Sequence, residues 1–130
     1  LLYGSIRQAD WSNHQVAVAP QTQAAPTSDF SDSTTYTIGI GRKISDQWSA
    51  TISYKTEEAT DNTGTSLLSP TDGYEAVGAA AIYTLENGTE ITVGVNYSMV
   101  GDKTITSSGV SGLYSDNTVV TSGIKVAYNF

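Results

Sequence analysis

Residues 90–99 read EITVGVNYSM, and every second side chain in this stretch is apolar. In an extended strand, successive side chains point to opposite faces, whereas an α-helix would need apolar residues three and four positions apart. The apolar side chains that would share one face are Ile91, Val93, Val95, Tyr97 and Met99. The alternation therefore predicts a β-strand with one apolar face and one small, polar face.

The same two-residue period recurs along the chain, and helical spacing is nearly absent. It is clearest at the C-terminus, in Ile124, Val126, Tyr128 and Phe130, and it is least regular in residues 1–11. We expect an all-β fold. The expected strands lie near residues 1–11, 34–44, 47–57, 73–85, 89–101 and 118–130.

Two kinds of connection join these strands. Ser45-Asp46 and Glu86-Asn87-Gly88 are tight turns, and Asn-Gly supplies the positive φ that a hairpin turn requires. The other three connections are long and polar, near residues 12–33, 58–72 and 102–117. Because successive connections of an antiparallel sheet lie at opposite ends, the tight turns would gather at one end and the long loops at the other. This asymmetry is typical of outer-membrane β-barrels.

Strand length also favours a membrane. The expected strands have about 9–13 residues, close to the roughly 9–11 that cross a hydrocarbon layer at a tilt and longer than the roughly 5–6 of soluble sheets. We expect an antiparallel up-and-down transmembrane β-barrel whose apolar face meets lipid and whose Ser, Thr and Gly face meets the lumen. Alternation alone leaves open a soluble barrel of the lipocalin type, in which the two faces would be exchanged.

Six strands are too few to close such a barrel, because the smallest have about eight. We therefore expect about six C-terminal strands of a larger barrel. The chain begins with Leu1 and shows no signal peptide, so we expect a truncated N-terminus, with the remaining strands upstream.

Aromatic residues support the membrane orientation. Trp48, Tyr83 and Tyr128 lie beside the tight turns or at the C-terminus, and Tyr97 lies toward the long-loop end. Two aromatic bands flank the apolar belt of membrane barrels, although aromatic residues are common in strands of every kind. We predict these four residues as interface aromatics.

Composition excludes several classes of function. The 130 residues include 13 acidic and 6 basic side chains, for a net charge of −7, and this chain lacks the basic stripe that nucleic acids require. There is no cysteine, and His14 is the single histidine, which leaves almost no material for a zinc site or a Ser-His-Asp triad. We expect no enzyme activity, no catalytic residue, no cofactor and no metal. No apolar stretch is long enough for a transmembrane helix.

The long loops carry carboxylates that calcium would accept as hard oxygen ligands. They are Asp29, Asp32, Glu57, Glu58, Asp61 and Asp102. None has the spacing of an EF-hand loop, so we expect solvated loop residues.

Cations on the polar face are the candidate substrate-binding residues. Arg7, Lys55 and Lys125 each lie on the more polar side of their strand, and a charge-assisted hydrogen bond from one of them would hold a carboxylate head. Alternatively, they pair with lumen carboxylates such as Glu90 or face water.

Several strings resemble the late strands of FadL/TodX-type outer-membrane transport proteins, by their order more than by any single motif. They are LYGSIR (2–7) with DWS (10–12), YTIGIGRK (36–43) with DQWS (46–49), PTDGY (70–74), ITVGVNY (91–97) with GD (101–102), and GIKVAYNF (123–130). The resemblance implies a 14-stranded monomeric barrel that carries long-chain fatty acids or other hydrophobic compounds across the bacterial outer membrane. The hatch that plugs the family's lumen and its lateral opening would lie upstream of this segment.

The last strand resembles the signal read by the barrel assembly machinery, through Ile124, Val126, Tyr128 and Phe130. An ordinary amphipathic strand that ends in Phe is the alternative. The sequence thus predicts part of an outer-membrane channel for hydrophobic molecules, with membrane lipid and the assembly machinery as partners. The alternatives are a porin or adhesin, and a soluble β-barrel that binds a small apolar ligand.

Overall fold

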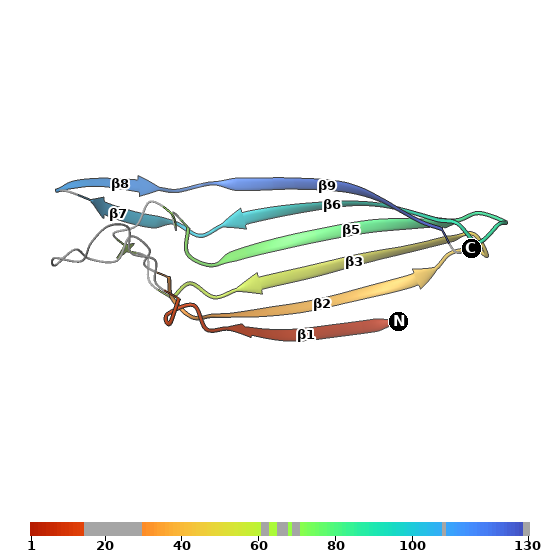
Figure 1. Ribbon diagram of the computed structural model, residues 1–130, viewed down its shortest axis with the longest axis horizontal. Helices are drawn as coiled ribbons and strands as arrows, with labels where there is room; N and C mark the ends of the chain where they lie inside the picture. The colour runs from red at the N-terminus through yellow and green to blue at the C-terminus, as the bar shows by residue number, and fades with distance from the viewer. Residues whose placement is uncertain (15–29, 61–62, 65–67, 69–70, 108, 129–130) are drawn as a thin grey trace.

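The computed structural model describes residues 1–14, 30–60, 63–64, 68, 71–107 and 109–128 (Figure 1). All regular structure in these ranges is β-strand. The strands are β1 (Leu2–Ala9), β2 (Ser33–Lys43), β3 (Trp48–Glu57), β4 (Thr63–Gly64), β5 (Tyr74–Thr84), β6 (Glu90–Val100), β7 (Lys103–Ser107), β8 (Val110–Tyr114) and β9 (Thr118–Ala127). The six long strands agree with the expected ranges to within a few residues at each end.

The six long strands form one sheet in the order β1-β2-β3-β5-β6-β9, and every neighbouring pair is antiparallel. Long strands that follow one another in the chain are therefore neighbours in the sheet, as Figure 1 shows. The all-β, antiparallel, up-and-down arrangement expected from the sequence is confirmed. Within the described ranges β1 and β9 are the two edges and do not pair with each other, so the sheet is open.

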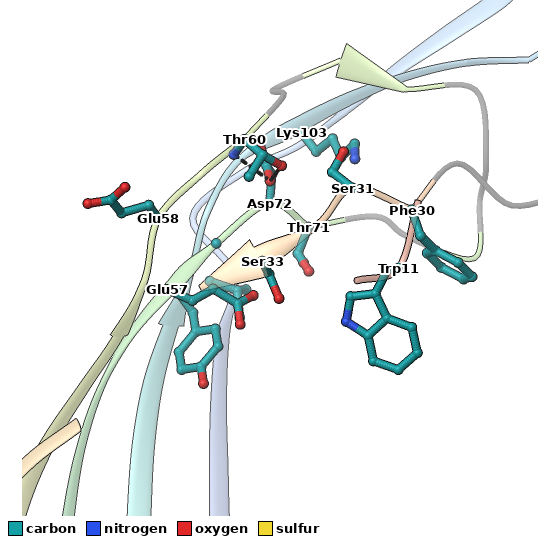
Figure 2. Close-up of a pocket in the computed structure, with 13 residues that line it drawn as sticks. Trp11, Phe30, Ser31, Ser33, Glu57, Glu58, Thr60, Thr71, Asp72 and Lys103 are labelled. Carbon is teal, nitrogen blue, oxygen red and sulfur yellow. Dashed lines mark hydrogen bonds between the residues drawn. The ribbon is translucent and has the colours of Figure 1, made fainter. Parts of the chain in front are cut away.

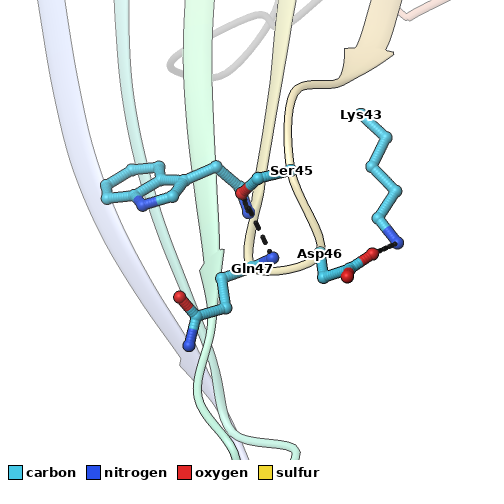
Figure 3. A network of polar contacts seen from close by, with 5 residues as sticks. Lys43, Ser45, Asp46 and Gln47 are labelled. Atoms are coloured by element: carbon cyan, nitrogen blue, oxygen red, sulfur yellow. Dashed lines mark hydrogen bonds and ion pairs between the residues drawn. The ribbon is translucent and has the colours of Figure 1, made fainter.

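The two tight turns follow from their sequences. In the turn between β2 and β3, the Ser45 hydroxyl oxygen accepts hydrogen bonds from the backbone N–H groups of Gln47 and Trp48, at 3.3 and 3.0 Å. Lys43 and Asp46 form an ion pair of 2.9 Å across the same turn (Figure 3). Between β5 and β6, Gly88 adopts a φ of 82°, which only glycine takes without strain.

The register places the alternating apolar side chains of all six strands on one side of the sheet, here called the apolar face. One row across it contains Gly4, Ile38, Tyr54, Val77, Tyr97 and Val120. The next row toward the tight turns contains Leu2, Ile40, Ile52, Ala79, Val95 and Ser122. Because every pair stays in register, the apolar face runs without a break from β1 to β9.

The apolar face is open rather than packed. Ile52 is 52% exposed, Val93 51% and Ile124 75%. Among the described residues only two hydrophobic side chains are buried, Ala76 and Ile105, and Ala76 lies on the opposite side of the sheet, here called the polar face. The branched side chains are thus on the accessible side of the sheet and not inside a sealed core.

The position of Tyr3 shows which side chains of β1 lie on the polar face and which on the apolar face. A Cβ atom on Gly39 would overlap the Tyr3 ring, and the Tyr3 hydroxyl lies 3.0 Å from the Thr51 Oγ1. Tyr3 therefore lies along the polar face, over a glycine that leaves room for its ring. Leu2 and Ile6 consequently project from the apolar face, which settles the facing of the least regular segment of the sequence.

Part of the expected 102–117 loop is a hairpin. β7 and β8 pair antiparallel, β4 adds a parallel strand to β7, and the pair extends the ribbon of β6 and β9 beyond the main sheet (Figure 1). Two five-residue strands rich in Ser, Thr and Gly are too short and polar to stand out by periodicity. The loop prediction was wrong here, because Gly109 turns the chain with a φ of 81° and Ile105 is buried.

Candidate functional site

The polar face carries small side chains and a shallow hollow of about 460 Å³. Thr51, Ser53, Gly78 and Asn96 line the hollow, and the Asn96 amide donates a 2.7 Å hydrogen bond to the Ser98 hydroxyl. A Cβ atom at Gly78 would lie 3.0 Å from the Ser53 hydroxyl, so the glycine allows close approach. This face could hold water or a ligand.

The three predicted substrate-binding cations all lie on the polar face but not together. Arg7 is opposite Thr35, and Lys55 is opposite Thr37, in the half of the sheet nearer the long loops. Lys125 is opposite Thr92 in the other half and lines the hollow. Among the described residues the one ion pair is Lys43–Asp46, so the alternative pairing with Glu90 is not formed.

A polar row crosses the sheet at its long-loop end. Arg7, Thr35, Glu57 and Tyr74 are successive register partners on β1, β2, β3 and β5. The Thr35 hydroxyl donates a 2.7 Å hydrogen bond to the Glu57 carboxylate, and Thr35 is buried. Sequence reasoning singled out Arg7 but missed the row, because the register depends on where each long loop returns the chain.

A second cavity, of about 310 Å³, lies beyond this row among the long loops (Figure 2). It is here called the loop-end cavity. The rings of Trp11 and Phe30 lie at one side of it, with centroids 6.4 Å apart. Asp72 and Lys103 also line it, and they are only 8% and 4% exposed. The cavity therefore combines aromatic rings with buried groups of both charges.

Backbone contacts between two connections hold the cavity wall. Asp72 Oδ1 accepts hydrogen bonds from the backbone N–H and the hydroxyl of Thr60, at 3.0 and 3.1 Å. The Gly101 N–H donates to the Gly73 carbonyl at 2.9 Å, and a Cβ atom on Gly101 would overlap the Asp72 carbonyl oxygen. Gly101 thus permits the close approach of the two connections that carry Asp72 and Lys103.

Lys103 is the residue that sequence reasoning most clearly missed. It lies in a stretch expected to be a solvated loop, and nothing in the pattern KTITS singles out a buried cation. In the structure it begins β7, which pairs with β4 and β8, and it is buried.

The predicted interface aromatics lie on the apolar face. The rings of Trp48 and Tyr83 pack with centroids 4.9 Å apart, beside the tight turns. On β6, Ile91 lies in the same row as Trp48 and Tyr83. Tyr97 is six residues further along that strand, so it lies about 20 Å from this row. Tyr128 is exposed beyond the end of β9.

The four residues of the predicted assembly signal are described in part. Ile124 and Val126 project from the exposed apolar face of β9, and Tyr128 follows that strand. Phe130 lies outside the described residues.

Two of the loop carboxylates accept hydrogen bonds from loop backbone, whereas Glu57 lies in β3 and accepts its bond from Thr35. Asp32 accepts a 2.8 Å hydrogen bond from the Ser12 N–H, and Asp102 accepts one of 3.1 Å from the Asp116 N–H. The bond from Ser12 holds the pKa of Asp32 below its ordinary value. Asp29 and Asp61 lie outside the described residues.

The described ranges contain no group of three acidic or histidine side chains suited to a metal ion. They also contain no helix with the length and apolarity to cross a bilayer.

Comparison of the chain with protein-family models, with curated proteins and with solved structures finds no match, so the FadL/TodX resemblance stands as a hypothesis resting on the quoted strings.

Proposed function

We propose that this chain forms part of the wall of a bacterial outer-membrane β-barrel that takes up long-chain fatty acids or other hydrophobic molecules. The observation that carries the proposal is the apolar face, which is continuous over six strands and exposed over most of its length. Soluble monomers rarely expose a contiguous apolar patch larger than a few hundred Å². Lipid is the solvent that such a face requires.

The distribution of aromatic side chains supports a membrane orientation. Trp48 and Tyr83 pack together at the tight-turn end of the apolar face, and Tyr54 and Tyr97 share one row nearer the long loops. Two rows of mainly aliphatic side chains lie between them, and the row nearer the tight turns also includes Arg42 at its β2 end. Tryptophan and tyrosine concentrate where acyl chains give way to headgroups, because their rings are apolar and each carries one polar group. Tight turns would then face the periplasm and long loops the exterior.

The polar face supports a lumen. Its hollow is lined by hydroxyls, an amide and glycines, and Arg7, Lys55 and Lys125 lie on it without ion pairs among the described residues. Such a face would be wet or ligand-filled. The choice of fatty acids and other hydrophobic molecules as cargo, and of 14 strands for the complete barrel, comes from the FadL/TodX resemblance.

The orientation is tested by placing a charge on each face of β6 in the complete protein. Val93→Arg should lower the free energy of unfolding from lipid vesicles by about 2–4 kcal/mol, because it puts a cation near the bilayer midplane. The neighbouring Thr92→Arg, on the polar face, is the matched control and should have a much smaller effect. Equal effects of the two variants would refute the proposed facing.

Transport is tested separately by reconstitution. A plugged transporter for hydrophobic molecules should take up radiolabelled oleate into vesicles and conduct few ions. Steady ion conductance without oleate uptake would favour a porin.

A further inference from the structure

The loop-end cavity contains a cation, Lys103, for which the described residues supply no counter-ion. Lys103 is 4% exposed, and no carboxylate of the described residues lies within 4.0 Å of its ammonium. The described part of the chain also gives this ammonium no hydrogen-bond acceptor. No fully buried side-chain nitrogen there is left unsatisfied, so the Lys103 Nζ keeps contact with open space. The space that Lys103 lines is the cavity.

An unpaired buried ammonium is unfavourable, because it has lost water without gaining a partner. The carboxylates nearby already have partners. Asp72 accepts two bonds from Thr60, and Glu57 accepts one from Thr35. In Figure 2 the Glu58 carboxylate points away from the other lining residues. None of these three carboxylates of the cavity lining therefore serves as a counter-ion for Lys103.

The rest of the cavity indicates the shape of an anion that would suit it. Trp11 and Phe30 form an aromatic wall, with rings tilted by 59°. A volume of about 310 Å³ is at the small end of the range for ligand pockets, about 300–1,000 Å³. A single ring or a short chain therefore fits better than an extended one.

We propose that the loop-end cavity binds a small organic acid that consists of one aromatic ring and one carboxylate. Lys103 serves as counter-ion, and Trp11 and Phe30 contact the ring. The proposal does not depend on whether the main sheet crosses a membrane, since the cavity lies among the connections at the end of the sheet. Its failure would leave the function proposed above untouched.

The charge requirement is tested first on the unaltered complete protein, by equilibrium dialysis with radiolabelled benzoate, benzamide and benzylammonium. These three probes share a ring and differ in charge. Benzoate should bind at least about ten times more tightly than benzamide, because a hydrogen bond between charged groups is stronger than one to a neutral amide. Equal affinities, or tighter binding of benzylammonium, would overturn the proposal.

Variants then identify the groups. Lys103→Met keeps the length of the side chain but removes its charge, and it should weaken benzoate binding about ten- to hundredfold. Lys43→Met, at the far end of the sheet, is the matched control and should bind benzoate normally. Trp11→Leu should weaken benzoate and benzamide to a similar degree. Unchanged benzoate affinity in Lys103→Met would overturn the proposal, and if that variant fails to fold, the comparison of probes on the unaltered protein still decides.

Discussion

At single positions of the polar face, a glycine decides whether a neighbouring side chain can lie directly against the sheet. The Tyr3 ring occupies the space that a side chain at Gly39 would need, whereas open space surrounds Gly123 on β9. Gly39→Ala should therefore displace Tyr3, break its 3.0 Å contact with Thr51 and lower the free energy of unfolding by about 1–3 kcal/mol. Gly123→Ala is the matched control and should change it little. Urea unfolding of both variants measures the difference.

The same experiment carries an internal check. In a Tyr3→Ser background the ring is gone, so Gly39→Ala should cost much less than it does alone. A cost that is independent of Tyr3 would show that the glycine is needed for its backbone rather than for the ring above it.

The tight turn between β2 and β3 gives a prediction about pH. A hydrogen bond and charge attraction from Lys43 hold the pKa of Asp46 below its ordinary value. Since the folded pKa is the lower one, the small stabilisation from this pair is present above about pH 4 and is lost as the pH falls through the folded pKa. Lys43→Met should raise the pKa of Asp46 toward its ordinary value, measured by NMR titration of the side chain.

Asp32 serves as the control in that titration. Its pKa is lowered chiefly by the backbone N–H of Ser12, far along the chain from Lys43. It should not respond to Lys43→Met. A shift of both carboxyls would mean that the substitution alters the fold rather than one pair.

At the scale of elements, the β5–β6 hairpin depends on a backbone conformation rather than on packing. Gly88 has a φ of 82° and no atom within 4 Å of the position where a Cβ would lie. Gly88→Ala should still lower the free energy of unfolding by about 1–2 kcal/mol, because a side chain is strained in this region. Gly112→Ala in β8 has equally open surroundings and an ordinary φ, so it should have a smaller effect. Equal costs for the two would contradict the conformational explanation.

Elements differ in how far the sequence predicts them, and the reason is length. Ten or eleven residues of strict alternation, as in β6, give a signal that no helix would share. The five residues of β7 contain only two repeats of the two-residue alternation, so their sequence cannot be distinguished from that of a polar loop. Lys103 stands at the start of β7, so the candidate site that depends on it could not be predicted either. Its burial arises from contacts between connections that are distant in sequence.

At the scale of the whole molecule, the alternation predicts which side chains share a face, but not what that face contacts. Ile38 and Tyr54, for example, are register partners on the apolar face. Whether the sheet closes into a barrel cannot be predicted in the same way. Closure depends on which strand pairs with the outer edges of β1 and β9. No feature of those two strands identifies their partner, because edge hydrogen bonds come from the backbone and carry little side-chain specificity.

The exposed apolar face predicts how the protein behaves in solution. Without detergent it should associate, because burying that face between copies releases water from apolar surface, and with micelles it should become monodisperse. Sedimentation with and without detergent measures this. The triple variant Ile38→Ser, Ile52→Ser and Val95→Ser should reduce association and should also weaken binding to vesicles in a flotation assay. A matched triple variant on the polar face, Thr37→Ser, Thr51→Ser and Thr92→Ser, should change neither. If the unaltered protein is monodisperse in plain buffer, the apolar face is covered by something other than lipid, and the membrane assignment fails.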